Sequence, residues 1–309
     1  MKRSNIIITI TILIVTMFVM MAFNTIPLNN FSVPSENSIT NTGMVNTVPS
    51  LAKSSATYGH AKRMEVYNGG NNNVAKYSTD GNWAGYVLTS SNPDFQAICG
   101  SWIVQTVSSS PYGNSAQWIG IGGVGNSKLI QTGTASDAGS GDISYQAWYE
   151  LLPNAPVYLS LNVKPGNIMS ASISDNTVNG NSWTIFIKDV TSGKSYTTTV
   201  SYNPCMKSAE WIEERPNMSP YTLANFGTAK FGSYYTGGTA NQVIYGSSGS
   251  EKPKTTQTEP DRVPLPPKYY IGQLSYTMYN IEYNGLLTST SSLDGTPCSS
   301  FTVTWEGSG

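Results

Sequence analysis

The chain has 309 residues, a length that suits one large domain or two of ordinary size. Only 11% of the residues are charged and the formal net charge is −1, so no long-range field favours binding to nucleic acid. The single histidine, His60, stands in a polar N-terminal stretch. A folded domain beginning after it would hold no Ser-His-Asp or Cys-His arrangement and no histidine-based zinc site, and we expect neither metal nor cofactor.

The N-terminus carries the features of an export sequence. Lys2 and Arg3 precede an uncharged apolar run over residues 6–23. Such a run is typical of a signal peptide, and its 18 residues are also near the minimum for a membrane span. A cleaved signal peptide and a retained N-terminal anchor over residues 1–23 both stay open. In either case the sequence predicts that the remainder is secreted or lies outside the cytoplasm.

Residues 24–76 are polar and show no hydrophobic period, which is typical of a spacer without a core. A pro-region is the alternative, because the basic pair Lys62 and Arg63 would suit a segment that covers an acidic cleft. From about residue 77 the pattern changes, and we place one β-rich domain over residues 77–309.

Within that domain, short runs rich in Val, Ile, Thr, Tyr and Trp alternate with Gly, Asn, Ser and Pro. Many short strands at such spacing predict a two-sheet sandwich or a barrel. One segment departs from the pattern: residues 247–268 hold five prolines and predict an irregular loop or flap. The predicted strands fall in residues 82–89, 99–107, 116–123, 127–133, 143–152, 167–174, 182–190, 195–202, 228–235 and 301–305.

Three cysteines, Cys99, Cys205 and Cys298, are too widely spaced for a zinc ribbon. In an exported protein they indicate one disulfide and one spare thiol, and the sequence does not decide which two would pair.

Alternate residues of a strand share a face, and this places several polar side chains in apolar settings. Glu210 shares a face with Ile212, Glu150 with Trp148, and Gln131 with Leu129. A carboxyl beside large apolar groups tends to have a raised pKa, which suits proton transfer. The alternatives are ordinary: sandwich tryptophans are mostly core, and strand-end glutamates are mostly solvated.

Several motifs in a fixed order carry a resemblance to a known family. They are "NWAGY" (82–86), "QWIGIGG" (117–123), "LIQTG" (129–133), "YQAWYELLP" (145–153), "CMKSAEWIEERP" (205–216) and "LANFGTAKF" (223–231). In this order and spacing the chain resembles the eqolisin family of glutamic peptidases. The resemblance implies a lectin-like sandwich of two antiparallel sheets, a signal and propeptide, and acid endopeptidase activity on polypeptides. The enzyme would be a zymogen, with its own propeptide as a partner and a monomeric state.

The resemblance also implies a site. Its catalytic glutamate falls on Glu210 and its catalytic glutamine on Gln131, with Trp118, Trp148 and Glu150 lining the cleft. Glu210 would take a proton from the attacking water and return it to the leaving amine, while Gln131 would stabilise the oxyanion. Glu213 and Glu214 are then expected to be solvated surface acids.

The sequence departs from the fungal pattern where Gly122 and Ala135 replace two aspartates, so the pH optimum is left open. Two other functions also stay open. A lectin-like carbohydrate binder or a glycoside hydrolase could use Glu150 and Glu210 on the same sandwich, although it would have no need of Gln131. A surface-layer or adhesion protein that has lost its chemistry would keep only the fold.

Overall fold

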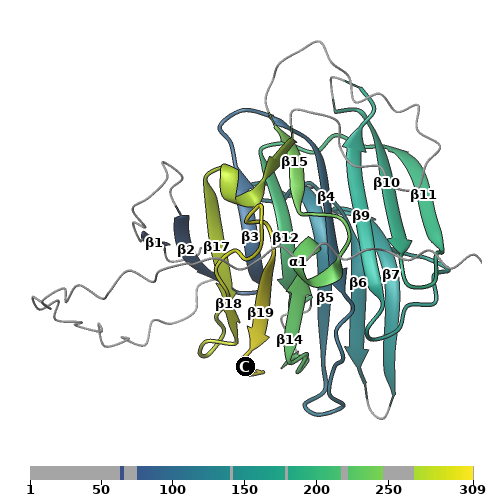
Figure 1. Cartoon of the computed structure of the whole chain (residues 1–309), viewed down its shortest axis with the longest axis vertical. Coiled ribbons are helices and arrows are strands. Elements are labelled where there is room, and N and C mark those ends of the chain that lie inside the picture. The colour runs from purple at the N-terminus through teal and green to yellow at the C-terminus, as the bar shows by residue number, and fades with distance from the viewer. Residues whose placement is uncertain are drawn as a thin grey trace, which may run out of the picture. The chain divides into compact units, whose positions relative to one another are not determined.

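Two mostly antiparallel sheets form the computed structural model of the chain (Figure 1). It describes residues 63–65, 75–139, 142–177, 180–216, 222–245 and 268–308. All of these belong to the unit Ala56–Gly309. The predicted signal or anchor, most of the predicted pro-region and residues 247–267 of the proline-rich segment lie outside the described residues. In the part that is described, no helix is long and apolar enough to cross a membrane.

The larger sheet has the strand order β1-β2-β17-β3-β12-β5-β6-β7-β8, with β13 beside β5. Two of its pairs are parallel, β2 with β17 and β5 with β13, and the others are antiparallel. Its strands are β1 (Arg63–Glu65), β2 (Ala75–Asp80), β3 (Trp83–Thr89), β5 (Gly113–Gly122), β6 (Leu129–Ala138), β7 (Ile143–Leu151), β8 (Val157–Tyr158), β12 (Ser208–Glu214), β13 (Thr222–Leu223) and β17 (Tyr276–Ile281).

The second sheet has the order β11-β10-β9-β4-β14-β19-β18, and β15 joins β4 and β16 beside this path. A short helix, α1 (Ser233–Thr236), and a 3-10 turn, η1 (Ile271–Gln273), complete the described elements. The strands of this sheet are β4 (Phe95–Ile103), β9 (Ile168–Asp175), β10 (Ser182–Asp189), β11 (Ser195–Ser201), β14 (Thr228–Phe231), β15 (Gln242–Tyr245), β16 (Lys268–Tyr270), β18 (Thr288–Thr290) and β19 (Phe301–Trp305).

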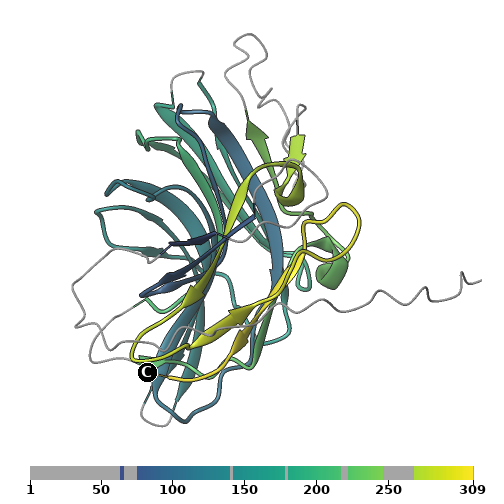
Figure 2. The same cartoon turned by 90° about the vertical axis from the view of Figure 1, so that its left-hand side faces the viewer.

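The predicted β-sandwich is confirmed, and each of the ten predicted strand segments overlaps a strand. The β-branched and aromatic residues of these segments fit a pleated surface that is buried on at least one face. Strands β1, β2, β8, β13, β15, β16, β17 and β18 were not predicted from the sequence. Of these, β17 is inserted between β2 and β3 in the larger sheet, so it borders the strands that position the site. Figure 2 shows how strongly the strands curve.

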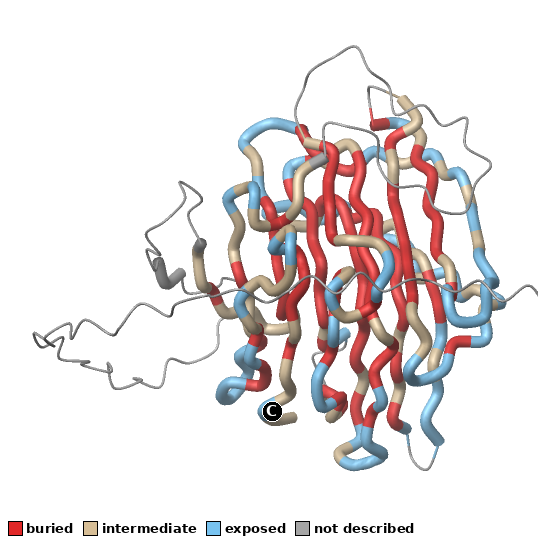
Figure 3. The backbone as a smooth tube through the Cα atoms, in the orientation of Figure 1, coloured by how far each residue is buried: buried red, intermediate tan, exposed pale blue. Residues whose placement is uncertain are grey.

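Alternating side chains of the larger sheet build two separate apolar layers. Long runs of buried residues follow the strands of the sandwich (Figure 3). Tyr86, Ile119 and Trp211 belong to the main core, which they share with residues of the second sheet. The indole of Trp211 spans the two sheets and donates to the Cys99 carbonyl at 3.0 Å. The intervening residues face the other side, where Val87, Ala116, Trp118, Leu129, Trp148 and Ile212 form a second cluster. That second cluster is the floor of the candidate site.

The disulfide prediction was wrong: no disulfide links the three cysteines, all of which are described. Cys99 is buried on β4, and its thiol donates to the Ala240 carbonyl at 3.4 Å. The sulfur of Cys205 accepts a hydrogen bond of 2.9 Å from Asn126, whereas Cys298 is exposed. The three residues therefore have different surroundings, and the sandwich is held by its core and its ladders.

Candidate active site

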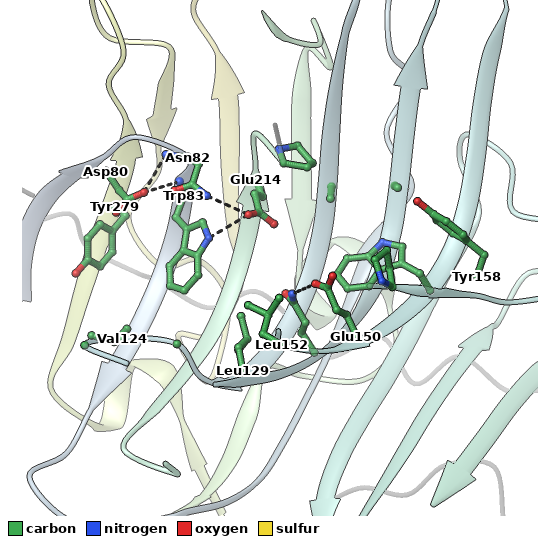
Figure 4. Close-up of a pocket in the computed structure, with 18 residues that line it drawn as sticks. Asp80, Asn82, Trp83, Val124, Leu129, Glu150, Leu152, Tyr158, Glu214 and Tyr279 are labelled. Carbon is green, nitrogen blue, oxygen red and sulfur yellow. Dashed lines mark hydrogen bonds between the residues drawn. The ribbon is translucent and has the colours of Figure 1, made fainter. Parts of the chain in front are cut away.

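A pocket of about 620 Å³ opens on the face of the larger sheet that carries the second apolar cluster (Figure 4). Strands β3, β5, β6, β7, β8, β12 and β17 contribute, together with the end of β2. Three of its lining residues are acids and none is Lys, Arg or His. The lining residues are Asp80, Asn82, Trp83, Ala116, Gly123, Val124, Gly125, Leu129, Gln131, Ala135, Trp148, Glu150, Leu152, Pro156, Tyr158, Glu214, Pro216 and Tyr279.

Gln131 and Glu150 meet in this pocket because β6 and β7 pair them directly. The Gln131 Nε2 donates to Glu150 Oε2 at 2.6 Å, and the Gln131 side chain is 4% exposed. Burial raises the pKa of Glu150, and the hydrogen bond from Gln131 offsets part of that rise. The amide carries two N–H groups, so one hydrogen remains for another acceptor after Glu150 is satisfied.

Glu214, at the end of β12, is the second carboxyl group of the pocket and accepts three side-chain donors. Trp118 Nε1 donates to Oε2 at 2.7 Å, while Asn82 Nδ2 and Trp83 Nε1 donate to Oε1 at 3.1 and 3.3 Å. Burial raises the pKa of Glu214 to about 7, the three donors oppose the rise, and the nearby Glu150 carboxyl adds to it. This carboxyl can therefore change protonation state between mildly acidic and neutral solution.

The placement of Glu210 does not fit its predicted role. It shares a face with Glu214, but its side chain is 0% exposed and it does not line the pocket. Burial raises the pKa of Glu210 well above its ordinary value, and the Ser208 hydroxyl offsets only part of the rise. A carboxyl enclosed in this way has no access to a substrate in the pocket, so the structure brings Gln131 together with Glu214 rather than with Glu210.

The prediction that Glu213 and Glu214 are solvated surface acids was also wrong. Glu214 lines the pocket, and Glu213 is 0% exposed on the opposite face of β12. Glu213 Oε1 accepts a hydrogen bond of 3.0 Å from Gln105 Nε2 within the sandwich. Burial raises the pKa of Glu213 well above its ordinary value, while Gln105 and Ser115 partly offset the rise.

The two predicted cleft tryptophans have different places. Trp148 lines the pocket, whereas Trp118 lies beneath it, 0% exposed, and reaches the pocket only through its N–H bond to Glu214. The rings of Trp83 and Trp118 meet edge to face, with centroids 5.2 Å apart. This contact orients two of the three donors to Glu214.

Gly122 and Ala135, the two positions at which the fungal pattern has aspartate, have different surroundings from each other. Ala135 lines the pocket and adds no acid there. Gly122 has φ +99°, and a Cβ built on it would stand 2.5 Å from the Lys128 carbonyl oxygen. The backbone at this turn therefore favours glycine and would be strained by any side chain.

Gly133 pairs with Trp118 on one neighbouring strand and with Trp148 on the other. Because glycine has no side chain, it leaves room for these two tryptophans. A Cβ at Gly133 would lie 2.2 Å from the Gln117 carbonyl oxygen and 2.5 Å from the Trp118 Cβ. We expect Gly133→Ala to lower the free energy of unfolding by about 1–3 kcal/mol, measured by denaturant titration. Gly139→Ala, where the nearest atom is 3.6 Å away, is the control and should stay within about 0.5 kcal/mol of the parent.

Asn82, Trp83 and Glu214 belong to the site but were not predicted from the sequence. Both signals were available: "NW" opens the first motif, and Glu214 shares the strand face of Glu210. Neither signal shows that the three side chains converge, because β3 and β12 become neighbours only through the sheet topology.

A carboxyl of raised pKa beside a carboxamide, in an apolar-walled groove, defines a site for acid–base chemistry on a β-sandwich. The family model described as the Peptidase A4 family matches residues 81–261, which is 181 of the 309 residues. The chain belongs to the Peptidase A4 family.

One known protein and two solved structures are similar to this chain. The chain is 28% identical over 178 residues to Aspergillopepsin-2 of Aspergillus niger, an alignment that spans 48% of this chain and 62% of that relative. Its fold is similar to that of scytalido-glutamic peptidase solved with a transition-state analog inhibitor, with a TM-score of 0.54, 18% identity, and coverage of 74% of this chain and 99% of the other. SCP-B, a member of the eqolisin family of peptidases solved with the tripeptide Ala-Ile-His, gives a TM-score of 0.51, 17% identity and the same coverage.

Proposed function

We propose that the chain is a secreted glutamic endopeptidase in which Glu214 and Gln131 act on the scissile peptide bond. The observation that carries the proposal is their shared pocket: a carboxyl held by three N–H donors and an amide held by Glu150. Family membership supports peptide hydrolysis. The apolar and aromatic walls, including Trp148, Leu152 and Tyr158, suit the side chains of an extended polypeptide.

In the proposed cycle, ionised Glu214 accepts a proton from a water molecule as the water oxygen attacks the carbonyl carbon. The resulting oxyanion accepts a hydrogen bond from the second N–H of Gln131. Protonated Glu214 then gives its proton to the nitrogen as the C–N bond breaks, which regenerates the carboxylate and releases an acid and an amine. Because both protonation states are needed in turn, a pKa of about 7 supports work in mildly acidic solution.

Glu150 has a positioning role in this cycle. It accepts one N–H of Gln131, which fixes the amide nitrogen rather than the amide oxygen beside it. The remaining N–H of that nitrogen is then the donor available to the oxyanion. This role is more specific than the one implied by the resemblance, in which Glu150 lines the cleft.

The functional test is digestion of a denatured protein across about pH 3–8, compared with hydrolysis of a polysaccharide. We expect fragments from the protein and none from the polysaccharide. Gln131→Ala should lower kcat by about 10²–10³, since it removes one preorganised oxyanion donor. Polysaccharide cleavage without proteolysis, or parental kcat in a folded Gln131→Ala variant, would contradict the proposal.

A further inference from the structure

Asp80, the last residue of β2, binds the backbone of the turn that leads into β3. Its Oδ1 accepts the backbone N–H of Asn82 at 2.9 Å and that of Trp83 at 3.1 Å. Both bonds are local, spanning two and three residues, and they fix the direction in which the chain enters β3. The Asp80 side chain also lines the pocket.

The two residues held in this way are those whose side chains reach Glu214. Asn82 Nδ2 and Trp83 Nε1 converge on the same oxygen, Glu214 Oε1, at 3.1 and 3.3 Å (Figure 4). Asp80 Oδ1 thus holds the backbone N–H groups of Asn82 and Trp83, and the side chains of these two residues both donate to Glu214 Oε1. A tilt of the turn would move both side-chain donors together.

Strand β17 fixes Asp80 itself from the side. Asp80 pairs with Ile281 in the parallel β2–β17 ladder, and its carbonyl oxygen accepts the Glu282 N–H at 2.8 Å. Both Asp80 and β17 lie outside residues 81–261, the part matched by the family model. The C-terminal part of the chain therefore supports a wall of the pocket.

We propose that Asp80 is a positioning residue that aims the Asn82 and Trp83 donors at Glu214. The inference rests on the proposed role of Glu214. Asp80 takes no part in bond making or breaking; it acts by keeping the turn in the one geometry that satisfies Glu214 Oε1.

The test compares Asp80→Ala with Asp80→Asn, because asparagine keeps the accepting oxygen and loses only the charge. In Asp80→Ala we expect kcat to fall about tenfold with little change in KM. Its pH–kcat/KM profile should move to higher pH, since donors to a carboxylate lower its pKa and here they are lost. Asp80→Asn should recover most of kcat and keep the parental profile. A pure charge effect would instead shift both profiles to lower pH, and that result would overturn the proposal.

Two further sets of variants keep the result interpretable. Asp189 accepts the Ser192 N–H at 3.2 Å in a turn of the second sheet, so Asp189→Ala removes a comparable turn bond and should leave the pH profile unchanged. Asn82→Ala and Trp83→Phe remove the side-chain donors and keep the Asp80 bonds to the turn, and both should move the pH–kcat/KM profile to higher pH. If neither moves it, the proposal is wrong even where Asp80→Ala does not fold. Activity in Glu214→Gln would instead overturn the proposed function on which the inference rests.

Discussion

Glu214→Gln is expected to lower kcat at least a thousandfold while the protein remains folded. Glutamine has the shape of glutamic acid, and its one oxygen can still accept the N–H bonds from Asn82 and Trp83. Its NH₂ group then faces the Trp118 N–H, and it cannot take a proton from water. Loss of a general acid–base group typically costs 10²–10⁴ in rate, and here one group serves both proton transfers. The measurement is kcat on a denatured protein substrate, with circular dichroism to verify the fold.

Glu210→Gln is the matched partner of this experiment, since it makes the same chemical change four positions earlier on the same strand. Glu210 is enclosed and away from the pocket, so we expect its replacement to leave kcat within about threefold of the parent. The reverse outcome, with Glu210→Gln inactive and Glu214→Gln active, would restore the assignment that the sequence motif implied.

The period of two residues accounts for most of what the sequence predicted correctly. It placed Gln131 on the strand face of Leu129 and Glu150 on that of Trp148, and all four residues line the pocket. That these faces border a cleft was implied by the family resemblance and not by the period. The same period could not decide which of Glu210 and Glu214 enters the pocket, because both lie on the same face of β12. They differ only in whether the pocket opens beside them. The side chains of the neighbouring strands decide where along β12 the pocket opens.

Long-range pairing explains the remaining misses. Strand β17 reaches the larger sheet from the C-terminal part of the chain and separates β2 from β3, so Asp80 and Tyr279 become pocket residues. Nothing local in "STDGNW" shows that its Asx-type turn will face a glutamate at position 214. The burial of Glu213 is likewise a property of the second sheet, since Gln105, which follows β4, supplies its donor.

The second large effect concerns stability, which we expect to decrease as the pH rises from acidic to neutral. Burial raises the pKa values of Glu210 and Glu213 well above the ordinary 4.5, and that of Glu214 to about 7. Between the ordinary value and the raised ones, the folded protein binds more protons than the unfolded chain. Stability is therefore fully present below the ordinary pKa and is lost as the pH rises through the folded pKa values. Each unit of difference corresponds to about 1.4 kcal/mol, so three such groups give a steep decline.

Glu213→Gln isolates one contribution to this decline without entering the pocket. The amide can still accept the Gln105 N–H, and it never has to become charged inside the sandwich. We expect this variant and the parent to have similar free energies of unfolding below the ordinary carboxyl pKa, and the variant to be the more stable near neutral pH. Urea titrations at several pH values measure this, with the exposed Glu306→Gln as the control that should follow the parent. If Glu213→Gln were less stable than the parent at neutral pH, an ionised Glu213 would have to be stabilised by its surroundings, and burial would not control the pH dependence of this fold.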